Sequence, residues 1–423
     1  MFEQPVKIHD LSHDGRGIGR LPSGKTCFIA GALPGETVRF KILKSRRSFD
    51  EGVCLEVVDA SSGREEPRCE YYANCGGCEL QHMTTEMQLD WKQRQLRAAL
   101  EKARLEVGSW MPALGADDWN YRRRTRLAVV FDKAGSAIIG YRARASKRIV
   151  NIGQCDVLDQ QLNALIPELQ VLAPRLKSSG LSELELTSGG QDLAVCFNLR
   201  SALTAEQIDL IRQRLGKVQI WQKLPGGPAV AVTGSGMLTA EVADGIELGF
   251  RPGQFVQINS AVNRAMIEQA IDWLNPESDQ SLLDLFCGAG NFGLAFSRRV
   301  KTVLGAEGSD ELCDQAKANA GLNGLHNLEF KTLNLFDPGQ FSRLGKQRFD
   351  LVVLDPPRAG ASELMPWIAK QAPEKVLYIS CHPATMVRDI QLLSQDYRID
   401  RVGAINMFPH TTHLEAMTLL VKR

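Results

Sequence analysis

Residues 281–293 read Ser281-Leu282-Leu283-Asp284-Leu285-Phe286-Cys287-Gly288-Ala289-Gly290-Asn291-Phe292-Gly293. The first six residues are mostly apolar and predict a buried strand, and a helical run follows Gly293. Gly288, Gly290 and Gly293 have the G-x-G-x-x-G spacing of a turn that lets the backbone press against a bound nucleoside. This stretch predicts an α/β domain that binds a nucleoside-like ligand.

Four later apolar segments predict further strands of the same sheet. Thr302–Ala306 is followed by Glu307, a carboxylate placed to accept hydrogen bonds from ribose hydroxyls. Leu328–Leu335 contains Asn334 near its end, where an amide could read the edge of an adenine. Ligands of α/β sheets bind at the carboxyl ends of the strands, so these side chains are expected at one site. The other two segments are Phe349–Leu354 before Asp355-Pro356-Pro357-Arg358, and Lys375–Ile379 before Ser380-Cys381-His382-Pro383.

Cys381 is the candidate nucleophile at this edge of the sheet. A buried, inert side chain is the commoner fate of a lone cysteine, and reactivity depends on an environment that the sequence does not display. The glycine spacing also fits an NAD-dependent dehydrogenase, which would leave Cys381 and the Asp355–Arg358 turn unexplained. Two C-terminal apolar segments, 402–408 and 415–421, match the terminal hairpin of a class I methyltransferase sheet and favour S-adenosylmethionine.

The totals describe an ordinary multidomain protein. A chain of 423 residues with 44% hydrophobic and 23% charged residues is expected to form two or three domains. We find no apolar run of about 18 residues and no signal-like segment, so we expect a cytoplasmic protein without a membrane partner. Ten cysteines in a reducing compartment favour metal binding or catalysis. The net charge of +1 means that any nucleic-acid site must come from local clustering of basic residues.

Residues 1–60 predict a small β-barrel. Short apolar runs alternate with turn signals, as in Thr26–Ile29, Thr37–Ile42 and Val53–Val58. The basic residues between Arg39 and Arg47 fit either a phosphate-binding face or a solvated edge that blocks strand pairing. The runs Asp14-Gly15-Arg16-Gly17-Ile18-Gly19 and Leu33-Pro34-Gly35-Glu36 resemble a TRAM domain, an RNA-binding barrel appended to RNA-modifying enzymes.

Three cysteines, Cys69, Cys75 and Cys78, form a C-x5-C-x2-C pattern that predicts a metal site. A fourth thiolate is needed for either Zn(Cys)4 or a [4Fe–4S] cluster. Cys155 lies in a polar loop and is the expected ligand, whereas Cys196 reads as a core strand position. The long first spacing favours a [4Fe–4S] cluster over zinc.

The remaining central region, within residues 61–250, is expected to be an α+β domain that carries the metal site. A helix is predicted over Thr84–Leu105, and it could pack on the C-terminal domain at 251–423. Trp119, Tyr121 and Tyr141 could stack on bases beside the arginines, or the charges could form a solvated face. The nine basic residues of this stretch are Arg122, Arg123, Arg124, Arg126, Lys133, Arg142, Arg144, Lys147 and Arg148.

These features together resemble the bacterial RNA (uracil-C5)-methyltransferases, which have a Rossmann-like class I methyltransferase domain. The barrel and the cysteines resemble the branch that acts on 23S rRNA, the RlmD type. Val256 is a small departure, because the family often has an aromatic or polar residue there. The matching motifs are Phe255-Val256-Gln257-Ile258-Asn259, Asp284–Gly290, Asp355-Pro356-Pro357-Arg358, Ser380-Cys381-His382-Pro383 and Pro409-His410-Thr411-Thr412-His413-Leu414-Glu415.

The resemblance implies methylation of uracil C5 in 23S rRNA by S-adenosylmethionine. Cys381 would add to C6 and so activate C5, and Glu415 would remove the C5 proton. Asp355 would contact either the cofactor or the uracil. The alternatives are a methyltransferase for tRNA or other rRNA, and a non-catalytic, redox-sensing RNA-binding protein. The partner is expected to be RNA rather than DNA, bound by a monomer. The implied cofactor-site residues are Gln257, Phe286, Gly288, Gly290, Asn291, Glu307, Asn334 and Asp355.

Overall fold

The computed structural model describes residues 5–345 and 347–423 and divides the chain into two compact units. The first unit comprises the residues up to Gln95 together with Arg142–Arg148 and Phe408–His413. The second comprises Leu96–Tyr141, Ile149–Met407 and Leu414–Arg423. Within the described ranges, no helix has the length and apolar character needed to cross a membrane.

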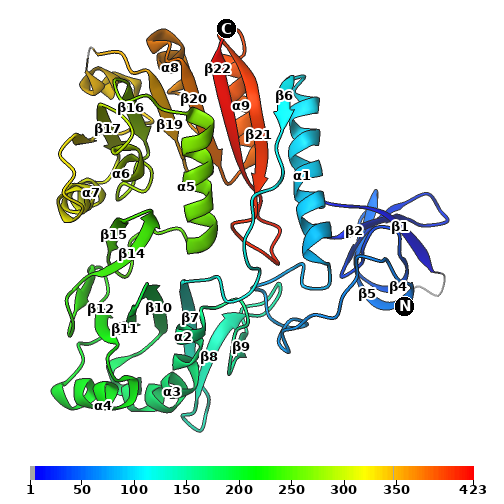
Figure 1. The fold of residues 1–423 in the computed structure, drawn as a ribbon. Coiled ribbons are helices and arrows are strands. Elements are labelled where there is room, and N and C mark those ends of the chain that lie inside the picture. The colour runs from blue at the N-terminus through cyan, green and yellow to red at the C-terminus, as the bar shows by residue number, and fades with distance from the viewer. Residues whose placement is uncertain (1–4, 346) are drawn as a thin grey trace. The chain divides into compact units, whose positions relative to one another are not determined.

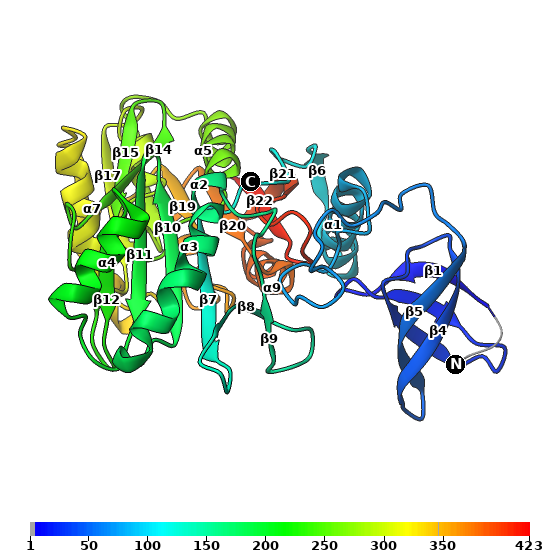
Figure 2. The same ribbon diagram turned by 90° about the horizontal axis from the view of Figure 1, so that it is seen from below.

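The first unit contains a closed five-stranded barrel, which confirms the predicted one (Figure 2). Inward-facing side chains such as Ile8, Ile29, Val38 and Phe40 form its core, because residues of a strand alternate between the two faces of the sheet. Two strands were not predicted, β1 and β2, and the others extend further than expected. The strands in barrel order are β1 (Val6–Leu11), β2 (Gly17–Arg20), β3 (Thr26–Ala30), β5 (Phe49–Asp59) and β4 (Thr37–Ser45).

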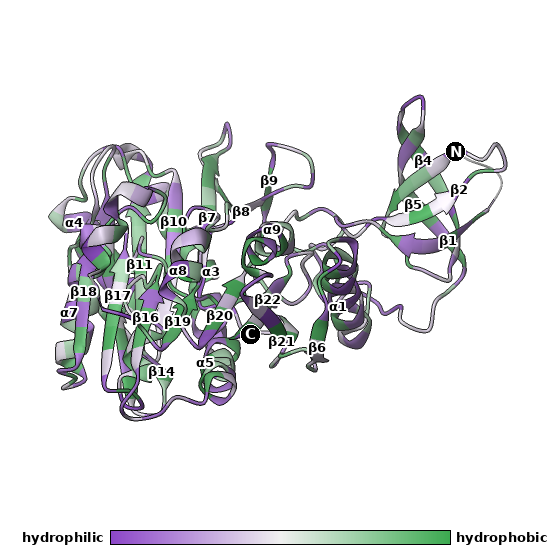
Figure 3. Ribbon diagram, turned by 90° about the horizontal axis from the view of Figure 1, so that it is seen from above, coloured by the Kyte–Doolittle hydropathy of each residue, from purple (hydrophilic) through white to green (hydrophobic). Residues whose placement is uncertain are grey.

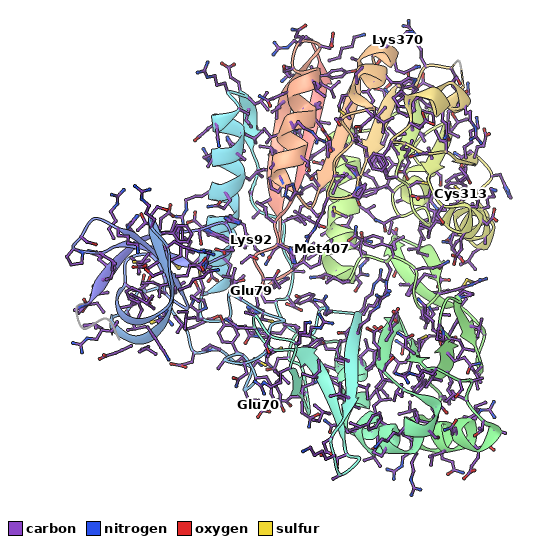
Figure 4. The ribbon with its side chains drawn as sticks, turned by 180° about the vertical axis from the view of Figure 1, so that it is seen from behind. Glu70, Glu79, Lys92, Cys313, Lys370 and Met407 are labelled. Carbon is purple, nitrogen blue, oxygen red and sulfur yellow. The ribbon has the colours of Figure 1, made fainter. Side chains whose placement is uncertain are left out.

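The first unit also holds the Pro409–His413 motif against the beginning of α1 (Thr85–Lys102). Gln88 is fully buried, and its Oε1 accepts from the backbone N–H of His410 at 2.9 Å. Lys92, labelled in Figure 4, donates from Nζ to the carbonyl of Phe408 at 3.1 Å. These polar contacts fix the backbone of Phe408 and His410 within the first unit.

The second unit contains an eight-stranded sheet, in which β22 is antiparallel to both its neighbours (Figure 1). This arrangement confirms the predicted class I methyltransferase sheet with its terminal hairpin. The order is β18 (Leu328–Thr332), β17 (Thr302–Glu307), β16 (Ser281–Leu285), β19 (Leu351–Leu354), β20 (Lys375–Ser380), β22 (Glu415–Lys422), β21 (Tyr397–Ile405) and β6 (Val107–Trp110).

Three details of this sheet differ from the sequence expectations. The strand β6 lies in the region assigned to the central domain, but it pairs in parallel with β21. The strand predicted over Leu328–Leu335 ends at Thr332, so Asn334 lies beyond it. The helical run expected after the glycine turn is only α6 (Gly293–Phe296).

Helices cover both faces of the sheet. Leu283 and Leu285 of β16 belong to a core cluster with Leu96 and Leu100 of α1, so these residues of α1 pack with the sheet. The same cluster includes residues of α8 (Met365–Gln371), α9 (Pro383–Leu393) and the 3-10 helix η2 (Pro338–Leu344). The helices α5 (Ser260–Leu274), α6 and α7 (Asp310–Leu322) also contact the sheet strands. Figure 3 shows hydrophobic colour along strands such as β19 and β20.

The rest of the second unit is built on a seven-stranded sheet and a separate hairpin of β14 (Leu238–Ala243) and β15 (Ile246–Phe250). Cys196 is a buried residue of β11, as expected. The sheet order is β13 (Ala229–Ala231), β12 (Gln219–Lys223), β11 (Asp192–Asn198), β10 (Glu183–Gly189), β7 (Arg124–Phe131), β8 (Ala137–Arg142) and β9 (Ile149–Asn151). Its helices are α2 (Gln160–Asn163), α3 (Leu165–Leu172), the 3-10 helix η1 (Ala173–Ser179) and α4 (Ala205–Leu215).

The loop after β19 is fixed by Asp389, a fully buried residue of α9. Its Oδ2 accepts from the Tyr378 hydroxyl at 2.7 Å and from the Ala361 N–H at 2.6 Å. The guanidinium of Arg388 pairs with Oδ1 at 2.7 Å and donates to the carbonyl of Ala359 at 2.9 Å. Gly360 has φ of 79°, and a Cβ there would lie 2.5 Å from Asp389 Oδ2, so glycine is required. This network fixes the Asp355–Arg358 turn from its C-terminal side.

Replacing Asp389 with Ala should lower the free energy of unfolding strongly, because the Tyr378 hydroxyl and the Ala361 N–H would lose their acceptor. Each orphaned donor costs about 1–3 kcal/mol. The matched variant Tyr378→Phe leaves the other contacts of Asp389 in place and should cost only about 0.5–1.5 kcal/mol. Urea-induced unfolding followed by near-ultraviolet circular dichroism measures both. Equal losses in the two variants would show that Asp389 does not organise the loop.

Candidate active site

Cys381 and Glu415 meet through strand pairing. Cys381 follows β20 directly, and Glu415 is the first residue of β22. Ser380 pairs with Ala416 in the antiparallel register, so the next pair along would join Cys381 to Glu415. The structure therefore brings the two predicted catalytic residues to one edge of the sheet.

The backbone around Cys381 is ordered by its neighbours. The hydroxyl of Ser380 donates to the carbonyl of His382 at 3.1 Å and accepts from the His382 N–H at 3.0 Å. Pro383 starts α9, where its missing N–H costs no hydrogen bond. The short link between strand and helix leaves Cys381 half-buried at the carboxyl end of β20.

The resting thiol lies in an environment that opposes ionisation. Burial raises the pKa of Cys381, and the carboxylates of Glu415 and Asp355 raise it further, while Arg358 lowers it. Burial also raises the pKa of Asp355 to about 6. The thiolate is the nucleophilic form of cysteine, so a deprotonating group or a bound cation is needed to generate it near neutral pH.

Glu307 is fixed at the carboxyl end of β17. Its Oε2 accepts from the Gly288 N–H at 3.1 Å, and its Oε1 accepts from the Gly308 N–H at 2.8 Å. Gly288 has φ of 56°, and a Cβ added there would meet nothing within 4 Å. The carboxylate and the glycine turn therefore lie together, as the ribose-binding hypothesis requires.

Two residues of this region were not predicted as site residues. Asp284 is buried, and its Oδ2 accepts from the Gly293 N–H at 2.8 Å. Burial raises the pKa of Asp284 to about 8. Phe336 lies with its ring centroid 5.7 Å from that of Phe286, which has a positive φ of 61°. A polar residue in an apolar strand was a signal for Asp284, whereas no pattern in the sequence indicated Phe336.

The other predicted cofactor residues have varied surroundings. Gln257 donates from Nε2 to Asp355 Oδ2 at 3.4 Å, so these two predicted cofactor-site residues contact each other. Asn291 exchanges two amide hydrogen bonds of 2.9 Å with Asn263. Asn334 is exposed, and its Oδ1 accepts from the Phe336 N–H at 3.0 Å. Gly290 has φ of 100° and lies in the turn before α6.

The cysteines of the predicted metal site belong to both units. Cys69, Cys75 and Cys78 are half-buried in the first unit, where the Gly77 N–H donates to Cys75 Sγ at 3.4 Å. Cys155 belongs to the second unit, and its Sγ accepts from the Tyr141 hydroxyl at 3.8 Å. In the part of the chain that the structure describes, no three or more His, Cys, Asp or Glu side chains are grouped as a metal ion requires.

Several arginines of the basic stretch have structural contacts. Arg124 and Arg126 both pair with Glu185, at 2.9 and 2.8 Å. Arg123 is buried and donates from Nε to the carbonyl of Gln257 at 2.7 Å. In the first unit, Arg144 donates to the carbonyls of Cys75 and Cys78. The stretch is therefore not a uniform solvated face, and part of its charge organises the protein itself.

Models of two known families match the two ends of the chain. A family model described as tRNA (Uracil-5-)-methyltransferase matches residues 242–423, and a TRAM domain model matches residues 3–55. The crystal structure of a Pyrococcus abyssi tRNA (uracil-54, C5)-methyltransferase in complex with S-adenosyl-L-homocysteine has a TM-score of 0.79. It is 24% identical and covers 99% of this chain and 100% of its own, which supports the fold.

Full-length relatives are more similar in sequence. The 23S rRNA (uracil(1939)-C(5))-methyltransferase RlmD of Pseudomonas putida is 40% identical, covering 99% of this chain and 93% of the relative. The protein of the same name from Mannheimia succiniciproducens is 37% identical, covering 100% of this chain and 96% of the relative. The resemblance seen in the motifs is thereby confirmed. This chain belongs to the RlmD family of 23S rRNA (uracil-C5)-methyltransferases.

Proposed function

We propose that this chain transfers the methyl group of S-adenosylmethionine to C5 of a uracil in 23S rRNA. The observation that carries this proposal is the pairing of β20 with β22, in which Ser380 pairs with Ala416, next to Cys381 and Glu415 in the sequence. A thiol and a carboxylate at one site are the two groups that C5 methylation of uracil needs. The names of the full-length relatives support 23S rRNA as the substrate.

In the first step, the thiolate of Cys381 adds to C6 of the uracil. The new S–C6 bond displaces the electrons of the C5–C6 double bond toward C5 and the O4 carbonyl, so that C5 becomes nucleophilic. S-adenosylmethionine, when bound, would supply an electrophilic methyl group for C5, and its S–CH3 bond would break to leave neutral S-adenosylhomocysteine. Arg358 favours the thiolate electrostatically, whereas the nearby carboxylates oppose it.

In the second step, Glu415 removes the proton that remains on C5. The electrons of the C5–H bond re-form the C5–C6 double bond, and the Cys381 thiolate leaves from C6. Glu415 is only 7% exposed, which excludes most of the water that would compete for the proton. One thiol and one carboxylate thus complete the reaction without a redox change.

The proposed cofactor site is acidic. Asp284, Glu307 and Asp355 are close enough that Asp355 and Glu307 raise the pKa of Asp284, after the larger effect of burial. Such a group of carboxylates favours a cationic ligand, and a sulfonium is cationic. Phe286 and Phe336 would contact the adenine, Glu307 would accept from the ribose, and Gln257 and Asp355 would line the methionine end.

We also propose that Cys69, Cys75, Cys78 and Cys155 hold a [4Fe–4S] cluster. Four thiols satisfy the ligand requirement of such a cluster. The Gly77 N–H on Cys75 Sγ and the Tyr141 hydroxyl on Cys155 Sγ are hydrogen bonds of the kind that stabilise ligating sulfur. The cluster has no step in methyl transfer, so its role would be structural or in positioning the RNA with the barrel.

Nucleoside mass spectrometry tests the reaction and its substrate. Unmodified 23S rRNA incubated with the protein and S-adenosylmethionine should gain 5-methyluridine, and tRNA should gain none. Cys381→Ala should form no product, because C5 is not activated without the thiolate. The control Cys54→Ala changes another half-buried thiol and should behave like the unchanged protein. Product in tRNA alone would contradict the rRNA assignment, and product from Cys381→Ala would contradict the mechanism.

The variant Glu415→Gln tests the covalent route. It should slow turnover by about 10²–10⁴-fold, because proton removal limits release of the thiolate. An RNA–protein adduct should then accumulate, visible as a slower band on a denaturing gel. The double variant Cys381→Ala with Glu415→Gln should show no such band. Turnover at the unchanged rate in Glu415→Gln would assign the proton transfer to another group.

Iron content tests the cluster. Protein purified without oxygen should contain about four iron atoms per chain and absorb visible light. Cys75→Ser and Cys155→Ser should each lose most of the iron, because a ligand is removed. The control Cys196→Ser, in the core strand β11, should retain it. Zinc in place of iron, or equal iron in all variants, would refute the proposal.

A further inference from the structure

Two asparagine side chains attach the end of α7 to the outer edge of β15, the edge that faces away from β14 (Figure 2). Asn319 Oδ1 accepts from the Gly249 N–H at 2.9 Å, and its Nδ2 donates to the Gly249 carbonyl at 3.0 Å. Asn323 makes the same pair of bonds with Glu247, at 2.8 and 2.7 Å. Positions four apart on a helix thus match positions two apart on a strand. Each side-chain amide takes the place of a peptide group of a neighbouring strand.

Asn319 differs from Asn323 in the partner of its second amide hydrogen. Asn319 is 1% exposed, and its Nδ2 also donates to the carbonyl of Ala289 at 2.9 Å. Gln315 donates from Nε2 to Asn319 Oδ1 at 3.2 Å, so the buried amide makes all four of its hydrogen bonds. Asn323 instead donates to the carbonyl of Asn319 at 2.8 Å, at the end of the same helix.

Ala289 lies in the glycine turn at which the cofactor is proposed to bind. Its neighbours Gly288 and Gly290 have positive φ values of 56° and 100°. Glycines have more backbone freedom than other residues, so a turn with two of them depends on outside contacts to keep one conformation. The peptide group between residues 289 and 290 is held at both ends. Its carbonyl accepts from Asn319, and its N–H donates to the Cys287 carbonyl at 2.9 Å.

The same turn holds the proposed ribose acceptor. The Gly288 N–H donates to Glu307 Oε2 at 3.1 Å, so the conformation of the turn affects the position of this carboxylate. The strand β15 supports the arrangement from the other side of Asn319. A Cβ added at Gly249 would lie 2.9 Å from Asn319 Oδ1 and 2.8 Å from Met237 Sδ, so the strand and the amide are in close contact.

We propose that Asn319 is a positioning residue for S-adenosylmethionine, and that it acts through the carbonyl of Ala289. The proposal rests on the proposed function, because it takes the position of the cofactor site from it. Without the bond from Asn319, the glycine turn would adopt several conformations, and binding of the cofactor would have to select one. Ordering of this kind reduces affinity. The reacting groups Cys381 and Glu415 are on other strands, so the chemical step itself should change little.

The variant Asn319→Ala removes the bond to Ala289 together with the two bonds to β15. Asn323→Ala is the matched control, because it removes the equivalent two bonds to β15 and leaves the bond to Ala289 in place. A third variant, Gly249→Ala, keeps the asparagine but pushes its amide away from the strand. Gly249 lies within β15, where the backbone of alanine is allowed. Near-ultraviolet circular dichroism establishes that each variant is folded.

Isothermal titration with S-adenosylhomocysteine measures the affinity of the site. The Kd should rise about fivefold or more for Asn319→Ala and Gly249→Ala, and less than about twofold for Asn323→Ala. In methylation of 23S rRNA, Asn319→Ala should raise the KM for S-adenosylmethionine by a similar factor and change kcat less than about twofold. Amide hydrogen exchange without ligand should be faster over residues 286–293 in Asn319→Ala than in Asn323→Ala, because the turn opens more often.

An unchanged Kd in folded Asn319→Ala, or an equal rise in Asn323→Ala, would overturn the proposal. A loss of kcat without a rise in KM would also overturn it, since Asn319 would then act on the chemical step. If Asn319→Ala does not fold, the Kd of Gly249→Ala decides by the same criterion. If the unchanged protein binds no S-adenosylhomocysteine and forms no 5-methyluridine, the proposed function fails. If it does both and the Kd values are equal, only the role of Asn319 is refuted.

Discussion

The antiparallel pairing of β20 with β22 is the constraint on which the site depends. It joins two parts of the chain by backbone hydrogen bonds as far as Ser380 and Ala416, the residues next to Cys381 and Glu415. A shift of one residue in this register would turn every side chain of β22 to the other face of the sheet. Such a shift is opposed by the core, because Ala416 and Leu420 of β22 are buried in the cluster around α8 and α9. Packing therefore protects the geometry of the reaction.

Burial of the carboxylates at this edge of the sheet lowers the free energy of unfolding, and other interactions in the fold must offset this loss. Burial raises the pKa of Asp284 to about 8 and that of Asp355 to about 6, so both prefer the neutral form more than an exposed aspartate does. The Gly293 N–H stabilises the ionised form of Asp284 in part. Strongly shifted pKa values of this kind are concentrated at functional sites. In this protein the two carboxyl groups with raised pKa values lie near the glycine turn and the strand ends that the sequence predicted to be a ligand site.

The sequence predicted those parts of the fold that depend on local patterns. Short apolar runs between turn signals indicated the barrel, and continuous apolar runs indicated most strands of the large sheet. Residues after strand ends indicated Cys381, Glu307 and Asp355. Pairing between distant segments was not predictable. The strand β6 is short and only partly buried, so nothing in Val107–Trp110 indicated that it joins β21. The contact of Phe336 with Phe286 likewise depends on how two loops pack, which no spacing in the chain encodes.

Arg123, which contacts the segment from Gln257 to Asn259, shows why the role of a basic cluster cannot be inferred from charge alone. The sequence left open whether the charges near Tyr121 accompany base-stacking aromatic residues or form a solvated face, but Arg123 is buried and donates to the carbonyl of Gln257. Burial lowers the pKa of Arg123 to about 10, which leaves the side chain charged at neutral pH. A buried charge with few partners is tolerated only where the surroundings compensate for its lost hydration. Gln257 links this buried charge to the reaction site, because its carbonyl accepts from Arg123 and its side chain donates to Asp355.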